Sequence, residues 1–404
     1  MLTVTEARER ILSHFKATTT ETVPLIEAVN RTLAIDILAD GDYPPFDNSA
    51  VDGFALRAED TSASPVTLNV VADIPAGSAP TVSLQAGQAA RIMTGAHLPN
   101  GANCVIPVED TDFNTRHAGT VAPKTITFSK HINAGENVRP RGMDMRSGDP
   151  VLKQGRMLKP QDLGLLATLG YANVTVHKKA RVALLSSGDE LLEVDAPLEP
   201  GKIRDSNSYA LAAAIVNAGA EVIRLGVAKD TRESVTGLLD KAASEKADLI
   251  LSSAGVSVGA FDFIKEVIDA NGSMDFWRVN MRPGKPLAFG EYRGIPFIGL
   301  PGNPVSAFVG FEVFVRPTLE RLNGNMDGDR QTVRVRCEEE IESDGRESYL
   351  RAKIQVQNGI RIAILTGHQG SGNLLSLVQA DALLIIPAGV KCVPAGSEVD
   401  AILL

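Results

Sequence analysis

Apolar and polar residues alternate with different periods along the chain, and the clearest pattern lies in its centre. The apolar runs RVALLSS, AEVIRLGVA and DLILSSA are separated by two helical segments, from about Ser208 to Asn217 and from about Thr231 to Ser244. Ser206 or Asn207 is suited to begin the first helix, and Asp230 with Glu233 resembles a capping box for the second. This alternation predicts a central parallel α/β domain over residues 178–327.

The regions on either side of the central domain have other patterns of apolar and polar residues. Short β-like runs separated by Pro, Gly and Asn predict a small β-rich domain over residues 46–138. Alternating strands after Asn323 predict a C-terminal all-β, barrel-like domain over residues 328–404. The remaining segments, 1–45 and 139–177, are assigned to an N-terminal elongated domain of mixed structure. It contains a helix after Thr3, with Glu6 at capping-box spacing, and a second helix over residues 159–170.

Composition narrows the class of protein. No apolar run in the 404 residues approaches the roughly 20 that a membrane-spanning helix needs, and the first residues lack a signal-peptide pattern. The three cysteines lie far apart without CxxC spacing, which disfavours disulfide frameworks and zinc sites and suits a reducing compartment. A formal net charge of −9 disfavours general nucleic-acid binding. We therefore expect a cytoplasmic protein with neither nucleic acid nor membrane as a partner.

The segment SSAGVSVGAFDF, residues 252–263, joins an apolar strand to a helical run. Small residues let backbone N–H groups approach a ligand closely, and a helix N-terminus favours an anion such as phosphate. Gly255, Ser257 and Gly259 are the predicted binding positions. The segment matches neither GxxxxGK[ST] nor GxGxxG, and an ordinary turn between strand and helix is the alternative.

Acidic residues follow the predicted strands. SSGDEL, residues 186–191, ends the first strand of the sheet, and ligands of open parallel sheets gather at the carboxyl ends of the strands. Ser187, Gly188 and Asp189 are therefore predicted to contact the ligand. The carboxylates Glu190, Asp230 and Asp262, each at a strand end, together suggest a magnesium site. Taken alone, the two carboxylates of the turn, Asp189 and Glu190, are better explained as a solvated surface or as helix caps.

Three cations stand within eight residues in WRVNMRPGKP, residues 277–286: Arg278, Arg282 and Lys285. In one extended strand Arg278 and Arg282 share a face, because side chains alternate with a period of two. We expect this segment to bind an anion, with a solubilising edge strand as the alternative. Pro301 lies in the loop after the strand IPFIG, where stiffening of a turn is a sufficient explanation.

Two further segments lie outside the α/β domain. DNSAVDGF, residues 47–54, contains Asp52, and RIMTGAHLP, residues 91–99, contains Thr94. Taken alone, both are better explained as turns than as sites.

Nine motifs in order along nearly the whole chain resemble the molybdopterin molybdenumtransferase family, which includes MoeA and the gephyrin E-domain. They are PPFDNSAVDGF, RIMTGA, VRPRGMDMRSGD, SSGDEL, GKIRDSNSYAL, AGVSVGAFDF, WRVNMRPGKP, GLPGNPVSA and QGSGNLLSLVQADALLIIP. The resemblance implies a four-domain homodimer of molybdenum-cofactor synthesis. Such an enzyme inserts molybdenum from molybdate into adenylylated molybdopterin and releases AMP with the assistance of Mg²⁺.

The resemblance also implies a cleft shared between subunits. Glu190, Asp230, Asp262, Arg278, Arg282 and Lys285 match functional positions in the α/β half. Asp52, Thr94 and Asp144 match positions that the partner subunit contributes. A molybdopterin adenylyltransferase is a further possible partner.

The chain departs from the family pattern at several positions. Met143 stands where a glutamate is usual, Ala254 where a glycine is usual, and Arg278 and Arg282 where lysines often occur. Arginine keeps the charge and adds a planar fork for oxyanions, but it does not release a proton near neutral pH. Two rival functions are adenylylation of molybdopterin itself, because the α/β domain resembles that transferase, and a non-catalytic scaffold like gephyrin.

Overall fold

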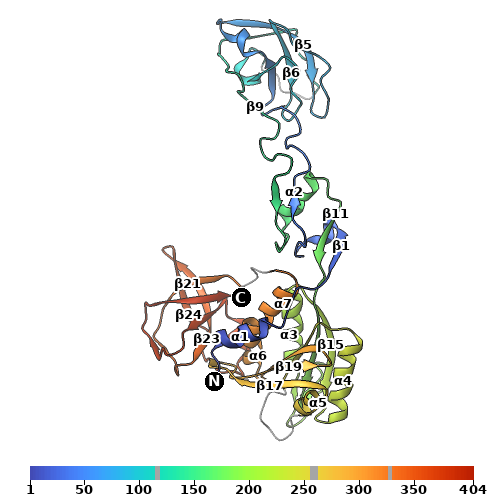
Figure 1. Ribbon diagram of the computed structural model, residues 1–404. Coiled ribbons are helices and arrows are strands. Elements are labelled where there is room, and N and C mark those ends of the chain that lie inside the picture. The colour runs from blue at the N-terminus through green and yellow to red at the C-terminus, as the bar shows by residue number, and fades with distance from the viewer. Residues whose placement is uncertain (114–118, 255–262, 326–329) are drawn as a thin grey trace. The chain divides into compact units, whose positions relative to one another are not determined.

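The computed structural model describes residues 1–113, 119–254, 263–325 and 330–404 (Figure 1). The chain divides into two compact units, one of residues 36–153 and one of residues 1–35 together with 154–404. Within the described ranges, no helix is long and apolar enough to cross a membrane. The two units are described separately below.

The unit of residues 36–153 is built on one five-stranded sheet. Its strand order is β7 (Cys104–Pro107), β4 (Gly53–Leu56), β6 (Gln88–Ile92), β5 (Val66–Ile74) and β8 (Thr125–Phe128). Side chains alternate between two apolar layers, so that Phe54 and Ile106 lie in one and Ala55 and Val105 in the other. The short pairs β2 (Ile37–Leu38) with β10 (Pro150–Leu152) and β3 (Asn48–Ser49) with β9 (Val138–Arg139) complete the unit.

The other unit begins with α1 (Val4–Leu12). Thr3 and Glu6 form the predicted capping box, and Val4, Ala7 and Ile11 are buried. These three side chains belong to the same apolar core as the central sheet. The first helix therefore packs on the α/β core and not, as its assignment to the N-terminal domain predicts, with residues 139–177. The pair β1 (Thr20–Pro24) with β11 (Asn173–His177) and the helix α2 (Pro160–Thr168) follow.

The central sheet has six strands, in the order β15 (Glu221–Ala228), β12 (Arg181–Ser187), β16 (Leu249–Ser253), β20 (Ile295–Leu300), β19 (Pro286–Tyr292) and β17 (Gly272–Arg278). The first four are parallel, which confirms the predicted α/β domain. β19 is antiparallel to both of its neighbours, so β17 runs in the same direction as the first four. The helices α3 (Ser206–Asn217) and α6 (Pro304–Gly310) cover one face, and α4 (Arg232–Ser244) and α5 (Phe263–Asn271) cover the other (Figure 1).

Two predicted helix caps were wrong. Asp205, not Ser206 or Asn207, caps α3, because its buried carboxylate accepts a hydrogen bond from the Ser208 N–H. Thr231, not Asp230, caps α4 by accepting from the Ser234 N–H. In both helices an adjacent residue whose side chain has an equally suitable oxygen accepts the capping hydrogen bond. The side chain of the residue predicted to form the cap can therefore make other contacts.

The segment that carries the three cations is not one extended strand. Arg278 ends β17, whereas Arg282 lies in β18 (Met281–Arg282), which pairs with β23 (Glu347–Gln357) of the C-terminal domain. The prediction that Arg278 and Arg282 share a strand face was therefore wrong. The chain leaves the central sheet here because other segments bind the intervening backbone groups, as described below.

The C-terminal domain is a closed barrel of five strands. Its order is β23, β24 (Ile360–Leu365), β21 (Thr332–Cys337), β27 (Glu398–Leu403) and β25 (Ala382–Ile386), and β25 pairs back with β23. Its interior includes Val335, Leu350, Ala363, Leu384 and Val399. This confirms the predicted barrel, to which the structure adds one short helix, α8 (Leu374–Val378).

Candidate active site

The register of the central sheet brings several predicted site residues to one edge. Ser186 is paired with Ser253, and Ser253 with Leu300, so β12, β16 and β20 end at the same level. Ala288 is opposite Gly299, and Arg278 is opposite Pro286, which places the end of β17 beside the loop after β20. Ser187, Pro301 and Arg278 therefore lie along the carboxyl edge of the parallel strands, where ligands of open α/β sheets bind.

The loop after β12 presents two carboxylates at this edge. Asp189 accepts a hydrogen bond from the Asp230 N–H at 3.2 Å, which ties this loop to the loop after β15. Glu190 is exposed and Asp230 is half-buried. Gly188 has a φ of 146°, a backbone conformation that residues with a Cβ rarely adopt. Glycine is therefore favoured in the turn that precedes Glu190.

The predicted magnesium ligands are only partly within the described residues. Asp262, and with it Gly255, Ser257 and Gly259, lies in the segment 255–262 that the structure does not describe. Among the residues that the structure describes, no cluster of three or more His, Cys, Asp or Glu side chains is placed to hold a metal ion. Glu190 and Asp230 come from adjoining loops and nevertheless suit Mg²⁺, which is commonly held by one or two carboxylates together with substrate phosphates.

The N-terminal residue Leu2 and the start of the barrel strand β23 hold the cationic segment. The Leu2 N–H donates to the Arg278 carbonyl at 3.1 Å, and the Asn280 N–H donates to the Leu2 carbonyl at 2.8 Å. On the other side, the Glu347 N–H donates to the Asn280 carbonyl at 3.1 Å, and Arg346 donates to the Met281 carbonyl. These bonds bend the segment out of the sheet and fix the backbone between Arg278 and Arg282.

The environment of Arg282 contains a second arginine that we did not predict from the sequence. Arg351 of β23 is fully buried and donates to the carbonyls of His368, Gln369 and Gly370 and to the Ser376 hydroxyl. Burial, together with the neighbouring Arg282 charge, lowers the pKa of Arg351. The one visible signal was a charge inside an alternating apolar strand, YLRAKI. The Asp344 carboxylate lies 3.9 Å from the Arg282 guanidinium and offsets part of the positive charge of the two arginines.

A second residue missing from the predicted set is Asn207, in the first turn of α3. Its side-chain amide donates to the Ser253 hydroxyl at 2.8 Å and to the Gly302 carbonyl at 2.7 Å. It therefore joins the ends of β16 and β20. Asn207 can form this bridge because Asp205 caps the helix. The motif GKIRDSNSYAL, which contains Asn207, gave no sign of the bridge.

Ala254 at the end of β16 has a φ of 80°. This left-handed conformation is costly for a residue with a Cβ, and it explains why glycine is usual here. We expect Ala254→Gly to raise the free energy of unfolding by about 1 kcal/mol. Denaturant unfolding of the two proteins measures this difference, and Gly164→Ala, at an open helical position, is the comparison for a change in chain entropy alone. A lower stability of Ala254→Gly would contradict the interpretation.

Three predicted residues lie in the unit of residues 36–153. Asp52 and Thr94 are in direct contact, because one Asp52 carboxylate oxygen accepts from both the N–H and the hydroxyl of Thr94, each at 2.7 Å. Asp144 is exposed and forms an ion pair with Arg139 at 2.7 Å. The usual glutamate of this motif is replaced by Met143, which is 62% exposed. The turn residues Asp52 and Thr94 thus form one polar group, with the hydroxyl oriented by the carboxylate.

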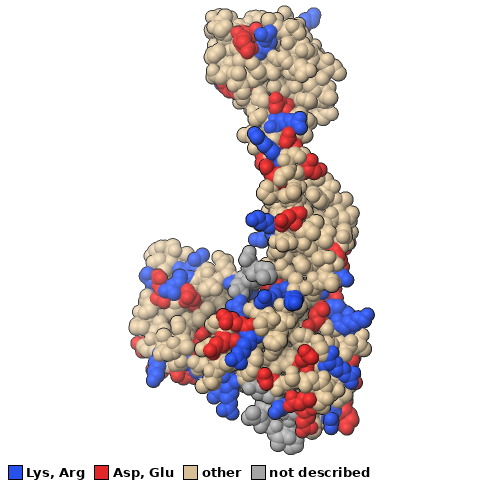
Figure 2. All heavy atoms as spheres, in the orientation of Figure 1, with Lys and Arg blue, Asp and Glu red and all other residues tan. Residues whose placement is uncertain are grey.

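The distribution of charge makes the cationic segment a local feature. Figure 2 shows acidic and basic side chains interspersed over the visible face of the unit of residues 1–35 and 154–404. Along the carboxyl edge of the central sheet, Glu190 and Asp230 follow β12 and β15, whereas Arg278 ends β17 and Arg282 and Lys285 follow it. Such an arrangement suits a ligand that carries several negative charges together with a divalent cation.

Three family models match the chain in succession. The MoeA N-terminal region (domains I and II) matches residues 2–170, the probable molybdopterin binding domain residues 183–321, and the MoeA C-terminal region (domain IV) residues 334–404. Among curated proteins, the molybdopterin molybdenumtransferase 2 of Mycobacterium tuberculosis is 40% identical over 99% of each chain. The molybdopterin molybdenumtransferase of a Nostoc species is 39% identical, over 94% of this chain and 88% of the relative.

Solved structures agree with these matches. A molybdopterin biosynthesis MoeA protein from Pyrococcus horikoshii superposes with a TM-score of 0.84 at 32% identity and covers all of both chains. Sequence motifs, successive family models and full-length structural similarity therefore lead to one conclusion: this chain belongs to the molybdopterin molybdenumtransferase (MoeA) family.

Proposed function

We propose that this chain acts in molybdenum-cofactor biosynthesis and inserts molybdenum from molybdate into adenylylated molybdopterin, with release of AMP. The observation that supports this most directly is that strand-end carboxylates and a cationic segment lie along one carboxyl edge of the central sheet, the acids after β12 and β15 and the cations after β17. Relatives that match nearly the whole chain are named molybdopterin molybdenumtransferases. Adenylylated molybdopterin and molybdate are both anions, as this edge requires.

The side chains act by position and charge. Arg278, Arg282 and Lys285 bind phosphate and molybdate oxygens, and the arginines do so as planar forks that remain protonated. Glu190 and Asp230, with Asp262, would hold Mg²⁺, which supplies charge neutralisation at the pyrophosphate. Water or a molybdate oxygen attacks a phosphorus of the pyrophosphate, and the P–O bond that joins its two phosphates breaks with release of AMP. The fixed charges stabilise this transition state without a covalent protein intermediate. Ser187, Asp189 and Pro301 line the same edge.

The proposal includes a cytoplasmic homodimer with four domains per chain, over residues 1–45 with 139–177, 46–138, 178–327 and 328–404. Asp52, Thr94 and Asp144 would complete each cleft from the partner subunit. Support comes from the preformed contact between Asp52 and Thr94, since a hydroxyl held by a carboxylate is already oriented. A role in ligand binding suits that group better than turn formation alone.

The purified protein should release AMP from adenylylated molybdopterin only when molybdate and Mg²⁺ are supplied, with molybdenum appearing in the product. Asp230→Asn should raise the Mg²⁺ concentration for half-maximal rate about tenfold, because one carboxylate charge is lost while the side-chain shape is kept. Asp248→Asn, at the amino end of β16, is the matched control and should leave this concentration unchanged. Efficient adenylylation of free molybdopterin from ATP would instead support the adenylyltransferase function, and an unaltered Mg²⁺ dependence would remove Asp230 from the metal site.

A further inference from the structure

The connections of the central sheet diverge at the carboxyl ends of β12 and β16. From β12 the chain passes through α3 to β15 on one side of this strand pair, and from β16 it passes through α5 to β17 on the other side. The two helices cover opposite faces of the sheet. Neighbouring strands with diverging connections form a topological switch point, which is where open α/β sheets bind their ligands. We therefore expect the ligand of this sheet to lie next to the ends of β12 and β16.

A buried polar group without a partner lies at this switch point. Ser186 of β12 is fully buried, and its hydroxyl has no hydrogen-bond partner among the residues that the structure describes. It is paired with Ser253 of β16, and both side chains face α3, because Leu184 and Leu251, two residues earlier, lie in the core on that face. An unpaired buried hydroxyl is destabilising and uncommon in native proteins. Its presence indicates that this end of the sheet is built for binding as well as for stability.

Asn207 of α3 connects the end of β16 with the loop after β20. Where these two strands end, the Ala254 N–H donates to the Leu300 carbonyl at 3.0 Å. The Asn207 amide donates to the Ser253 hydroxyl at 2.8 Å and to the Gly302 carbonyl at 2.7 Å. Both hydrogens of the amide are thereby used, each on a different segment of the chain. The helix therefore sets the distance between the end of β16 and the loop after β20.

The two segments that Asn207 connects are already in close contact. A Cβ at Gly302 would stand 3.4 Å from the Ala254 Cβ, so the backbones have little room to move toward each other. The Ser252 hydroxyl donates to the Ala254 carbonyl at 2.9 Å and holds the β16 side. Pro301, a predicted binding residue, precedes Gly302 in the loop. The bond from Asn207 to Gly302 therefore also fixes the backbone that carries Pro301.

We propose that Asn207 is a positioning residue for the proposed transfer, and this inference rests on that function. Its amide holds the end of β16 and the loop after β20 at the separation that the phosphate-bearing substrate requires. It makes no hydrogen bond to the substrate through its amide hydrogens, because both are used within the protein. Catalysis at this edge depends on placing the reacting groups, so a small displacement of the loop slows the chemical step more than it weakens binding.

Asn323 offers a matched control at the opposite end of the same helix and sheet. Its amide donates to the Ala218 carbonyl at 3.1 Å, and its oxygen accepts from the Ala180 N–H at 3.0 Å. It thus joins the end of α3 to the residue before β12. Asn207 and Asn323 are both half-buried and both make two such bonds. Asn207→Ala and Asn323→Ala should therefore lower the midpoint of thermal unfolding to a similar extent.

The kinetics of molybdate-dependent AMP release should separate the two variants. We expect kcat to fall about 20-fold in Asn207→Ala, with the KM values for molybdate and adenylylated molybdopterin within about twofold of wild type. Asn323→Ala should keep the wild-type kcat. Ser253→Ala removes one acceptor only and should lower kcat about fivefold, which provides a milder variant if Asn207→Ala does not fold. Adding Ser253→Ala to Asn207→Ala should cause little further loss, because the bond between them is already absent.

Three outcomes would overturn the inference while the proposed function stands. They are an Asn207→Ala variant no slower than Asn323→Ala, a raised KM with an unchanged kcat, and fully additive losses in the double variant. A raised KM alone would mean that Asn207 contributes equally to binding of the substrate and of the transition state. A wild-type protein that releases no AMP when molybdate and Mg²⁺ are supplied would instead refute the proposed function, and this role with it.

Discussion

Arg282→Ala is expected to lower kcat/KM for molybdate-dependent AMP release about 100-fold, equivalent to about 2.7 kcal/mol of transition-state binding. Arg282 stands where the barrel strand β23 joins the carboxyl edge of the central sheet, next to the buried Arg351. Without Arg282, the bound anion loses one charge-assisted contact, while the backbone of the cationic segment stays fixed by its hydrogen bonds. Steady-state kinetics with varied molybdate measure the change.

Two further variants test whether the loss of kcat/KM comes from the missing anion contact. Arg282→Lys keeps the charge without the planar fork and should recover most of the activity, since lysine is common at this position in the family. Arg293→Ala removes an exposed arginine at the opposite edge of the sheet, where it pairs with Asp240, and should have no effect. If Arg282→Ala retains wild-type molybdate dependence, the proposed anion contact is wrong.

Mixing the Arg282→Ala variant with an Asp52→Ala variant tests the shared cleft as well. In a random mixture of homodimers and heterodimers, about one quarter of the clefts would combine two unmutated halves. Recovery to about that fraction of wild-type activity is expected after subunit exchange. No recovery, in a mixture that sedimentation shows to be dimeric and exchanged, would place both residues in the same subunit's cleft.

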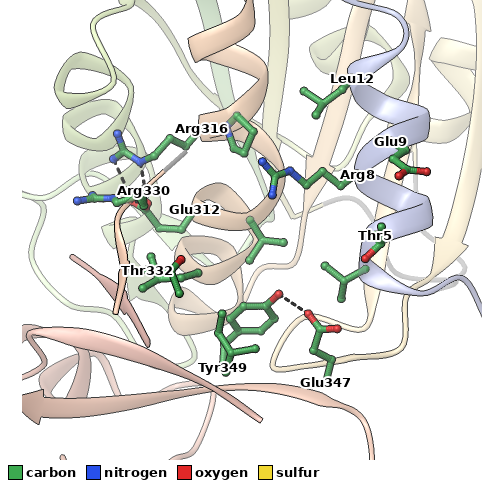
Figure 3. A pocket seen from close by; sticks show the side chains of 15 residues that line it. Thr5, Arg8, Glu9, Leu12, Glu312, Arg316, Arg330, Thr332, Glu347 and Tyr349 are labelled. Carbon is green, nitrogen blue, oxygen red and sulfur yellow. Dashed lines mark hydrogen bonds and ion pairs between the residues drawn. The ribbon is translucent and has the colours of Figure 1, made fainter. Parts of the chain in front are cut away.

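Glu312→Gln is expected to lower the free energy of unfolding by about 3 kcal/mol, because it leaves the buried Arg316 and the partly buried Arg330 without the carboxylate that neutralises them (Figure 3). An amide oxygen cannot accept all four of the N–H bonds that the carboxylate receives. Denaturant unfolding at neutral pH measures the difference. Glu398→Gln, at an exposed residue that pairs with Arg334 and Arg336, is the control and should change stability by less than about 0.5 kcal/mol.

The same carboxylate predicts a pH dependence. Burial alone would raise the pKa of Glu312, but hydrogen bonds and charges from Arg316 and Arg330 outweigh it, and the pKa lies below the ordinary value of 4.5. A depressed folded-state pKa means that the stabilisation is complete above the unfolded-state value and is lost as the pH falls through the folded-state value. The stability gap between wild type and Glu312→Gln should therefore be constant near neutrality and close below about pH 4.5. A gap that persists unchanged in acid would contradict this origin.

The sequence was most informative where the structure depends on neighbours along the chain. Thr3 and Glu6 form the predicted capping box, and the runs over residues 181–187, 221–228 and 249–253 are parallel strands, as their apolar character indicated. The two wrong caps were shifted to Asp205 and Thr231, because several side chains in each turn carry a suitable oxygen. Local rules specified that a cap exists but not which of the competing groups forms it.

The cationic segment shows where local reasoning fails. Period-two alternation assumes one continuous strand from Arg278 to Arg282, but Leu2 and Glu347 bind the backbone between them and divert it into the barrel. Arg351 was missed for the same reason, since its partners lie 17 to 25 residues further along. Neither arrangement produces a periodic pattern of apolar and polar residues in the sequence.

By itself, then, the sequence determined the order of strands and helices, the acids and cations at strand ends, and the family, since all of these depend on short motifs and periodic burial. The tertiary structure decided that Arg278, Pro301 and Glu190 belong to one edge, that Thr94 is oriented by Asp52, and that Glu312 is shared by two arginines. These contacts join residues distant in the chain. Only the register of the sheet and the burial of charge, both consequences of the complete fold, select them.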